Sequence, residues 1–353
     1  MNKTVRVLAV GDVVSAVGCE KLRELLPSLK KEKNIDVCIV NGENAAVGNG
    51  MTAFSCEHIF ASGADVITGG NHTFKRREFY ETLENSYSIV RPINYSEDCP
   101  GRGYTIVDKG FVRIGVVNVL GTVYMENLKN PFDCMDEAIK KLRDEVNIII
   151  VDLHAEATAE KKALGFYLDG KVSAVYGTHT HVQTADEQIL PNGTGYITDV
   201  GMTGPSLSVI GVKPELAIEK MRTNMPVRFE NPNDNALLQG IIFEIDRSSG
   251  KTVSVERISI KKGGGCREKE NNCVLLCIDG GCNPALLLYE HSDNPRGRNK
   301  HKHGYGKYAD GGDYFAVCNE RLVKSVFRNG QRKYCVSFAL LSTALYGKIG
   351  LFG

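Results

Sequence analysis

Residues 5–12 read VRVLAVGD, a short valine-rich apolar run that ends in Gly-Asp. Such a run is typical of a strand that is buried on both faces and ends at a loop. A helical pattern follows it, because leucines recur at helical spacing between residues 22 and 29. A strand followed by a helix is the repeating unit of a mainly parallel sheet with helices on its faces.

The same alternation continues along the chain. Further strands are predicted in DVCIVNGEN (36–44), ADVITGGNH (64–72), NIIIVDLHAE (147–156) and VSAVYGTHTH (172–181), with helices at 53–62, 133–146 and 158–168. Hairpin signals interrupt the alternation in 104–120, 188–198 and 240–260, with turns at Asp108-Lys109-Gly110, Asn192-Gly193 and Ser249-Gly250. Together the two patterns predict an α/β fold, a four-layer α/β/β/α sandwich with mixed sheets.

The overall composition is that of an ordinary globular protein. The chain has 353 residues, of which 42% are hydrophobic and 24% charged, which excludes a fibrous, collagenous or wholly disordered protein. The chain lacks a run of about 18 apolar residues, and its start lacks the apolar run of a signal peptide. We therefore expect a cytoplasmic protein with no membrane partner. The net charge of +1 by itself favours no nucleic-acid partner.

The composition changes abruptly after residue 261. Residues 262–353 carry 14 basic and 8 acidic residues, a net charge of +6, whereas residues 1–261 carry 29 and 34, a net charge of −5. The later segment is rich in glycine and follows neither the helical nor the strand period. We therefore predict one domain over residues 1–261 and an irregular Gly/Cys-rich basic extension over residues 262–353.

Six of the 11 cysteines lie in this extension. The spacing of Cys266, Cys273, Cys277 and Cys282 lacks the usual Cys-x2-Cys pairs of zinc sites. A zinc site there, and RNA binding by the basic run KHKHGYGK (300–307), are alternatives to a poorly ordered appendage. The five other cysteines are scattered and odd in number, which favours reduced thiols.

Polar side chains follow five of the predicted strands. They are Asp12, then Glu43 and Asn44, then Asn71 and His72, then Asp152 and His154, and finally His179 and His181. The carboxyl ends of strands in such a sheet share one edge, so these side chains can converge. Each alone has a simpler explanation, a turn or cap residue for an aspartate and a hydrogen-bonded polar residue for a histidine. Five such strand ends together favour a ligand site.

Carboxylate, amide and imidazole ligands in this mixture suit iron, manganese or zinc. Six ligands suffice for two ions that share one carboxylate, namely Asp12, Glu43, Asn71, His154, His179 and His181. Two ions about 3.5–4 Å apart would clamp a phosphoryl group and generate a hydroxide for in-line attack. Asn71 directly precedes His72, and neighbours on an extended chain point apart, so one can bind metal while the other faces substrate. Gly69 and Gly70 are expected to let the backbone turn tightly there.

These motifs resemble those of the calcineurin-like metallophosphoesterase superfamily and, within it, the YmdB-type branch of bacterial cyclic-nucleotide phosphodiesterases. The resemblance covers about residues 4–261 and is carried, in order, by NGENAA (41–46), GGNHTF (69–74), RPINY (91–95), NVLGTVYM (118–125), DLHAEAT (152–158), GTHTHVQTAD (177–186), TDVGMTGP (198–205) and PVRFE (226–230). It implies the metallophosphoesterase sandwich. In RPINY, Arg91 could contact phosphate or serve packing.

The resemblance also implies a role for each residue of the site. It implies that one metal is held by Asp12, Glu43 and His181, and the other by Glu43, Asn71, His154 and His179. Glu43 would be the bridge, Asn44 would touch metal or phosphate, and His72 would be the catalytic acid. The superfamily usually has Asp-x-His in its first motif and Asp at the bridge, where this chain has Asp12-Val13-Val14 and Glu43. Both departures are features of the YmdB-type branch and favour iron, with manganese and zinc as alternatives.

The function implied is a dinuclear metal-dependent phosphodiesterase that hydrolyses 2′,3′-cyclic and also 3′,5′-cyclic nucleotides, with His72 as the general acid. The substrate would be a small cyclic nucleotide. Nucleic acid is expected only as a contact of the basic extension, and a homo-oligomer is left open. The alternative is a regulatory protein of bacterial developmental signalling that binds a nucleotide or a partner, with catalysis secondary.

Overall fold

The computed structural model describes residues 3–233 and 235–261, together with the backbone of residues 274–277, 314–318, 321–328 and 331–339. By its internal contacts the chain divides into two compact units, residues 1–263 and residues 264–353. The first unit contains every residue expected at the metal site.

Eight strands form the first sheet of the N-terminal unit, in the order β2-β12-β13-β1-β3-β4-β5, with β14 paired to β13. The strands β1, β3, β4 and β5 run parallel, whereas β13 is antiparallel to both β1 and β14. The strands are β1 (Thr4–Val10), β2 (Asp12–Val13), β3 (Val37–Asn41), β4 (Val66–Thr68), β5 (Ile89–Val90), β12 (Met202–Pro205), β13 (Ala236–Asp246) and β14 (Thr252–Ile260).

Six strands form the second sheet, in the order β10-β11-β9-β8-β7-β6. Its centre is parallel, and the hairpins β6-β7 and β10-β11 make both edges antiparallel. The strands are β6 (Tyr104–Asp108), β7 (Arg113–Leu120), β8 (Ile148–His154), β9 (Ala174–Thr178), β10 (Gln188–Ile189) and β11 (Gly195–Ile197). The three hairpins predicted from their turn residues are confirmed.

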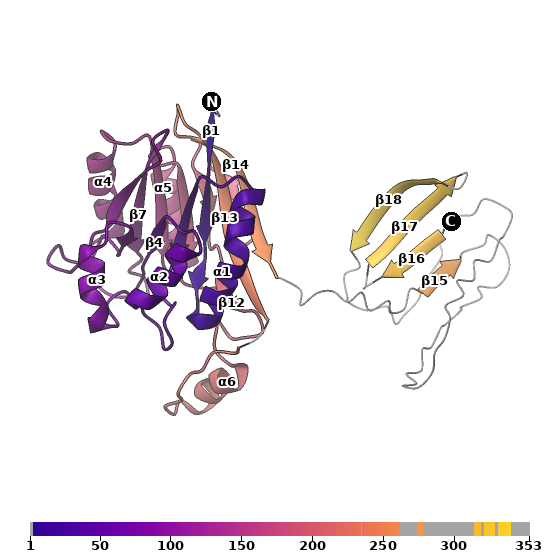
Figure 1. Ribbon diagram of the computed structural model, residues 1–353, viewed down its shortest axis with the longest axis horizontal. Helices are drawn as coiled ribbons and strands as arrows, with labels where there is room; N and C mark the ends of the chain where they lie inside the picture. The colour runs from indigo at the N-terminus through magenta and orange to yellow at the C-terminus, as the bar shows by residue number, and fades with distance from the viewer. Residues whose placement is uncertain are drawn as a thin grey trace. The chain divides into compact units, whose positions relative to one another are not determined.

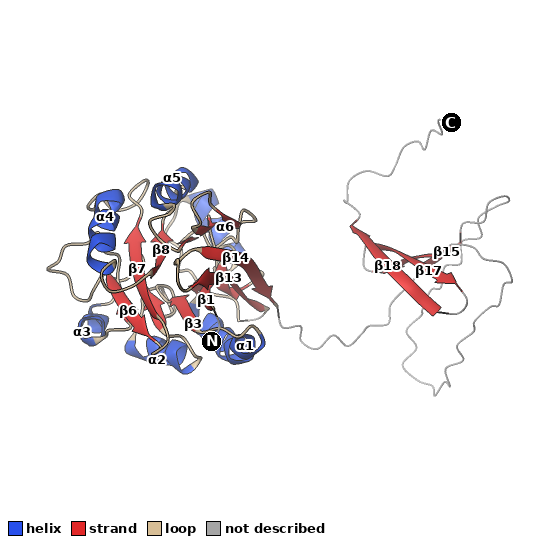
Figure 2. Cartoon of the chain, turned by 90° about the horizontal axis from the view of Figure 1, so that it is seen from above, coloured by secondary structure: helices blue, strands red, loops and turns tan. Residues whose placement is uncertain are grey.

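Helices cover the outer face of each sheet, so the predicted four-layer α/β/β/α sandwich is confirmed (Figures 1 and 2). Helices α1 (Ser15–Glu32) and α2 (Ala53–Ala61) pack on the first sheet, and α4 (Pro131–Leu142) and α5 (Thr158–Leu168) on the second. The short α3 (Tyr80–Asn85) continues the 3-10 turn Arg77–Phe79.

Alternating side chains of the strands create the layers. In β1, Leu8 belongs to the buried cluster that contains Leu22 of α1. The preceding Val7 points the other way, into the cluster between the two sheets with Val116 and Ile150. Successive side chains of a strand point to opposite faces, so a central strand between two apolar layers must be apolar throughout. This explains the continuous apolar runs in the sequence.

The predicted helix 133–146 lies two to four residues further toward the N-terminus, at Pro131–Leu142. Proline is favoured at the first turn, where its missing N–H needs no partner. The side chain of Asn130 caps this turn by accepting a hydrogen bond from the Phe132 N–H at 2.9 Å. The start of α4 is therefore set by an Asn-Pro pair rather than by the apolar period.

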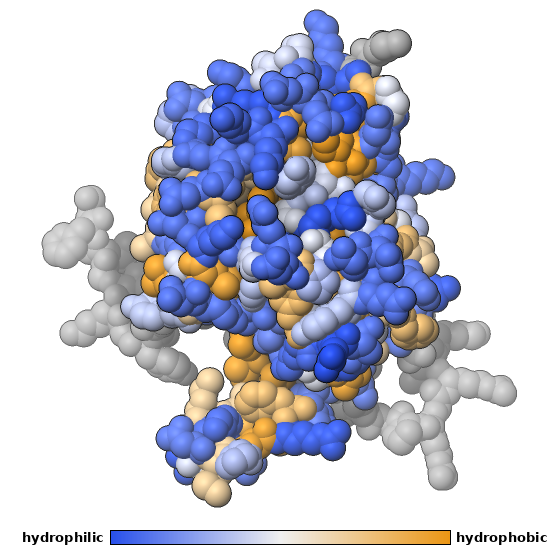
Figure 3. Space-filling view, turned by 90° about the vertical axis from the view of Figure 1, so that its left-hand side faces the viewer, coloured by the Kyte–Doolittle hydropathy of each residue, from blue (hydrophilic) through white to orange (hydrophobic). Residues whose placement is uncertain are grey.

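Helix α6 (Pro214–Thr223) projects from the body of the N-terminal unit (Figure 1). Of its residues only Ala217 is buried, and Ile218 and Met221 are exposed. In Figure 3 the projection at the bottom shows apolar side chains flanked by hydrophilic ones. Among the described residues, the helices are all too short or too polar to cross a bilayer.

The described part of the C-terminal unit is a four-stranded antiparallel sheet in the order β15-β16-β17-β18. Its strands are β15 (Val274–Cys277), β16 (Tyr314–Cys318), β17 (Arg321–Arg328) and β18 (Gln331–Ala339). The segment expected to be irregular thus contains strands, because runs such as VLLC and YFAVC combine β-branched, aromatic and other apolar residues. Cys266, Cys273, Cys282 and residues 300–307 lie outside the described residues, and Cys277 is described only by its backbone.

Candidate metal centre

The structure brings all eight predicted site residues together near the carboxyl ends of strands from both sheets. Each follows or lies at the end of a strand: Asp12 follows β1 and begins the short β2, Glu43 and Asn44 follow β3, Asn71 and His72 follow β4, His154 ends β8, and His179 and His181 follow β9. The first sheet supplies the carboxylates and amides and also His72, and the second sheet supplies the other three imidazoles. The site therefore depends on how the sheets face each other.

Glu43 lies at the centre and is fully buried. Its Oε1 accepts a hydrogen bond from the Asn44 side chain at 2.8 Å and lies 3.1 Å from Nδ1 of His72. Its Oε2 accepts from the backbone N–H of His72 at 2.9 Å and lies 3.4 Å from Nε2 of His154. One carboxylate thus contacts residues of both sheets, which suits the role of a bridge.

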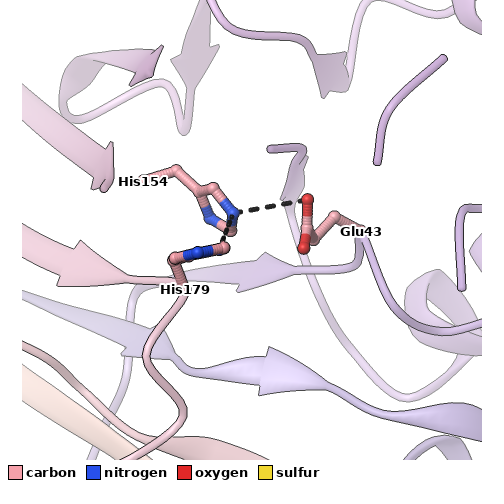
Figure 4. A group of neighbouring side chains, drawn as sticks. All are labelled: Glu43, His154 and His179. Carbon is pink, nitrogen blue, oxygen red and sulfur yellow. Dashed lines mark hydrogen bonds and ion pairs between the residues drawn. The ribbon is translucent and has the colours of Figure 1, made fainter. Parts of the chain in front are cut away.

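His154 joins Glu43 to His179 in one group (Figure 4). Nε2 of His154 lies 3.1 Å from Nδ1 of His179 and 3.1 Å from Oδ1 of Asn71. The ligand atoms of Glu43, His154 and His179 all lie within 4.8 Å of one another. A single ring nitrogen cannot hydrogen-bond three such neighbours at once, whereas several lone pairs directed at one point are what a cation requires.

Asp12 and His181 form a second group beside the first. Oδ2 of Asp12 accepts a hydrogen bond from the backbone N–H of His179 at 3.1 Å. Its Oδ1 is buried, lacks a hydrogen-bond partner among the described residues, and lies 3.6 Å from Nε2 of His181. Nδ1 of His181 donates to the Ile210 carbonyl at 3.0 Å, which leaves Nε2 facing Asp12 and, at 3.3 Å, the amide of Asn44.

The charge balance of the site also suits a cation. Asp12 and Glu43 are fully buried and, in the described part of the chain, ion-pair with imidazoles but with no lysine or arginine. Burial by itself would raise the pKa of Glu43, but the charges of His154 and His72 and their hydrogen bonds hold that pKa well below its ordinary value. Two buried carboxylates need compensating positive charge.

Burial and neighbouring charges also shift the pKa values of the imidazoles. Burial would lower the pKa of His154, but the carboxylates of Glu43 and Asp12 raise it to about 9. Burial and then the charge of His154 lower the pKa of His179 to about 4, so its ring is neutral near pH 7. Ionised carboxylates and a neutral imidazole are the forms that bind metal. Asp12, Glu43 and His179 therefore fit a metal ion as they stand, and His154 fits one once its ring gives up a proton.

Gly70 is required by the close approach of the backbone to the ligands. A Cβ atom at this position would lie 2.2 Å from Oε2 of Glu43 and 2.5 Å from Nε2 of His154. The expected tight turn begins at Gly70, whose carbonyl accepts from the Thr73 N–H, but Gly70 does not have a positive φ, so the close approach to the ligands is the feature that requires glycine. The absence of a side chain is what lets the loop after β4 pass over the site.

Asn71 and His72 lie in a turn rather than on extended chain, because the N–H of Thr73 bonds the Gly70 carbonyl at 3.1 Å. The two side chains nevertheless contact different groups. Asn71 faces His154, whereas Nδ1 of His72 lies 2.9 Å from Oδ1 of Asn44. The expectation that the two side chains diverge holds, but a turn and not strand alternation produces it.

Sequence reasoning gave no role to the residues that orient His154. Its Nδ1 lies 2.9 Å from the hydroxyl of Thr178, which donates to Asp152 at 2.7 Å. Burial raises the pKa of Asp152 to about 6 although it also accepts hydrogen bonds from Thr68 and Asn41. Asp152 stands two residues before His154 on β8 and so shares its face, a signal that the sequence did contain.

A buried ion pair holds the loop that carries His179 and His181. The ammonium group of Lys161 contacts Asp199 at 2.7 Å and donates to the Thr178 carbonyl at 2.8 Å. Asp199 in turn accepts from the N–H and hydroxyl of Thr180 at 3.2 and 2.7 Å. The role of Lys161 was not predicted, because a lysine in a helix is usually exposed.

Arg91 is buried away from these ligands, and its guanidinium donates to the carbonyls of Pro92 and Ser96, both at 3.0 Å. Its contacts are therefore those of a packing residue. The five cysteines of the N-terminal unit, Cys19, Cys38, Cys56, Cys99 and Cys134, are free thiols, as expected.

Comparison with known families and proteins places these observations in context. A family model described as "YmdB-like protein" matches residues 8–258. The chain is 44% identical over 255 residues to a 2′,3′-cyclic-nucleotide 2′-phosphodiesterase of Bacillus subtilis, and the match covers 72% of this chain and 97% of that protein.

Solved structures give the same result. The crystal structure of a phosphatase from Mycoplasma pneumoniae has a TM-score of 0.70 and 35% identity, and the match covers 74% of this chain and 95% of that chain. The crystal structure of a protein from Thermus thermophilus has a TM-score of 0.69 and 36% identity, and the match covers 73% of this chain and 99% of that chain. The similarity thus extends over the N-terminal unit.

Replacing Gly70 by alanine is expected to destroy the site, because the new methyl group would displace Glu43 or His154. Elemental analysis of the purified variant should find less than half the metal of the wild-type protein. Gly110→Ala is the control for backbone strain without crowding: Gly110 has a φ of 77°, so alanine strains the backbone there, but its Cβ meets no atom within 4 Å and the metal content should be unchanged. Full metal content in Gly70→Ala would contradict the role given to this glycine.

Lys161→Met is expected to lower the free energy of unfolding by about 3–5 kcal/mol, because it leaves Asp199 buried and unpaired. Urea-induced unfolding followed by circular dichroism measures the change. Lys162→Met is the matched control: this neighbouring lysine pairs with Asp186 at 3.2 Å with 43% of its side chain exposed, and its loss should change stability by less than about 1 kcal/mol. Equal effects of the two substitutions would show that burial of the pair is unimportant.

Proposed function

The chain belongs to the YmdB-like protein family, and on that premise we propose that it is a phosphodiesterase that opens the ring of nucleoside 2′,3′-cyclic monophosphates. The observation that carries the proposal is the group of Glu43, His154 and His179, of which Glu43 and His154 are fully buried, with His72 beside it. The Bacillus relative named for this reaction supports the choice of substrate.

We propose two metal ions, one held by Asp12, Glu43 and His181 and the other by Glu43, Asn71, His154 and His179. Asn44 would serve at the same centre, since its amide lies between Glu43 and His181. Bound ions would act as Lewis acids toward the phosphoryl oxygens and toward a water molecule. Iron is our first choice, with manganese and zinc as alternatives.

We propose that His72 donates the proton, and its contacts support this role. Its Nδ1 is engaged by Asn44 and Glu43, at 2.9 and 3.1 Å. Its Nε2 has no hydrogen-bond partner in the described part of the chain, and its side chain is 27% exposed, more than those of Glu43 and His154. The ring is thus fixed at one nitrogen and open at the other, as a general acid requires.

The proposed reaction breaks the bond between phosphorus and the 2′-oxygen. A water molecule supplies the hydroxyl group that becomes bonded to phosphorus, and the 2′-oxygen leaves with a proton from Nε2 of His72. His72 then recovers the proton released by the water molecule. The product is a nucleoside 3′-monophosphate. Nucleoside 3′,5′-cyclic monophosphates are proposed as a second substrate class, tested in the same panel.

His72→Ala is expected to lower kcat for 2′,3′-cyclic AMP by about 10²–10⁴-fold, because it removes the proton donor. Metal content should stay near the wild-type value, since His72 is not assigned as a ligand. His58→Ala is the matched control: this histidine lies in α2, stacks on Phe54 and contacts none of the site residues within the described chain.

Two results would count against the proposal. Unchanged turnover by His72→Ala would remove His72 as the acid. If the wild-type protein contains no metal and hydrolyses no cyclic nucleotide, the proposed phosphodiesterase activity is refuted. Chelation followed by readdition of iron, manganese or zinc separates loss of metal from loss of fold, because only the former is reversed.

A further inference from the structure

A pocket of about 550 Å³ lies beside the candidate metal centre. Its wall combines the start of α1, the loop 47–49, Lys75 and the segment 228–233. Pockets that bind small molecules generally have volumes of about 300–1,000 Å³. Neither the proposed ligands nor His72 line this pocket, so the proposed chemistry leaves it unexplained.

Hydrogen bonds connect this wall to the proposed site, two of them directly and a third through the segment that holds His181. The N–H of Ser15 donates to the Asn44 carbonyl at 2.9 Å, and the N–H of Lys75 donates to the His72 carbonyl at 3.0 Å. The Asn231 side chain donates to the Gly211 carbonyl at 2.8 Å. Gly211 directly follows Ile210, whose carbonyl accepts from His181. Two parts of the pocket wall are therefore bonded directly to the backbone of proposed site residues, and a third is bonded to the residue after Ile210, the partner of His181.

The lining of the pocket suits a flat, polar, negatively charged molecule. Phe229 lies in the wall with 52% of its surface exposed, a large aromatic ring open to solvent. Lys75 is exposed, and among the described residues its side chain makes no ion pair or hydrogen bond. The carboxylate of Glu230 is already paired with Lys213 at 2.7 Å. Aromatic rings that stack on bases beside a cation are the usual means of binding nucleotides.

Ser15 is an independent sign of a missing ligand. It is 3% exposed and lines the pocket, yet its hydroxyl has no hydrogen-bond partner in the part of the chain described. A buried hydroxyl without a partner is unfavourable and rare. Ser15 also has a φ of 59°, the left-handed region that non-glycine residues seldom adopt. A ligand hydroxyl, such as one on ribose, would satisfy it.

We propose that this pocket is the nucleoside subsite, in which the base stacks on Phe229 while the ribose contacts Ser15 and Lys75 faces the phosphate. The proposal rests on the proposed function, since the phosphate of the same molecule would lie at the metal centre. Stacking accepts any base, because every base has a flat face. The subsite therefore predicts selection for nucleotides over simple phosphodiesters, with little selection among the four bases.

The experiment compares two substrates, 2′,3′-cyclic AMP and ribose 2′,3′-cyclic phosphate, which lacks the base. Phe229→Ala should raise KM for the nucleotide about ten-fold or more and change kcat/KM for the base-free diester less than about two-fold. Phe229→Tyr keeps a flat ring and should retain the wild-type KM. Met221→Ala is the matched control, because Met221 is an exposed apolar residue of α6 outside the pocket.

Equal changes for both diesters, or no change for either, would overturn the subsite. If wild-type protein hydrolyses neither diester, the proposed function fails, and the subsite is then tested by calorimetry with adenosine 3′-monophosphate. Binding that Phe229→Ala weakens about ten-fold would support the subsite even so. Absent or unaffected binding would contradict it. Ser15→Gly, which removes the hydroxyl but tolerates the positive φ, should also weaken nucleotide binding.

Discussion

The buried carboxylate of Glu43 is the constraint on which the rest of the site depends. The negative charge of a fully buried carboxylate needs hydrogen-bond donors and positive charge around it. Here the backbone N–H of His72 and the amide of Asn44 donate hydrogen bonds, and the imidazole of His154 forms an ion pair. The same crowding requires glycine at position 70. Because these residues come from two sheets, the site is complete only when the two sheets are stacked.

The second sheet meets this constraint with a loop in an unfavourable conformation. His179 and His181 both have positive φ, 93° and 61°, which only surrounding contacts can maintain in residues other than glycine. Lys161 and Asp199 provide those contacts through Thr178 and Thr180. The loop therefore directs one imidazole to His154 and the other to Asp12 without the regular alternation of a strand.

Much of this could be predicted because it depends on local patterns. The apolar runs that end in Gly-Asp, Asn-Gly-Glu-Asn and Gly-Gly-Asn-His indicated the sheets and, from strand polarity, the convergence of the eight site residues. The partners of those residues depend on packing across the sheets, which no local pattern encodes. In the sequence Lys161 does not differ from other helix lysines, nor Thr178 from other strand threonines. Their roles depend on the pairing of β8 with β9. The strands within residues 262–353 were not predicted, because glycine-rich runs flank them.

The two ligand groups differ in a way that bears on the proposed metals. Where related enzymes of the superfamily usually have a histidine, this chain has Val14, which is 4% exposed and packs against Gly204 and Gly211. The Asp12 group therefore offers one imidazole, His181, whereas the other group offers His154 and His179. A site richer in oxygen favours a harder cation, so the two proposed sites would differ in the metal that each prefers.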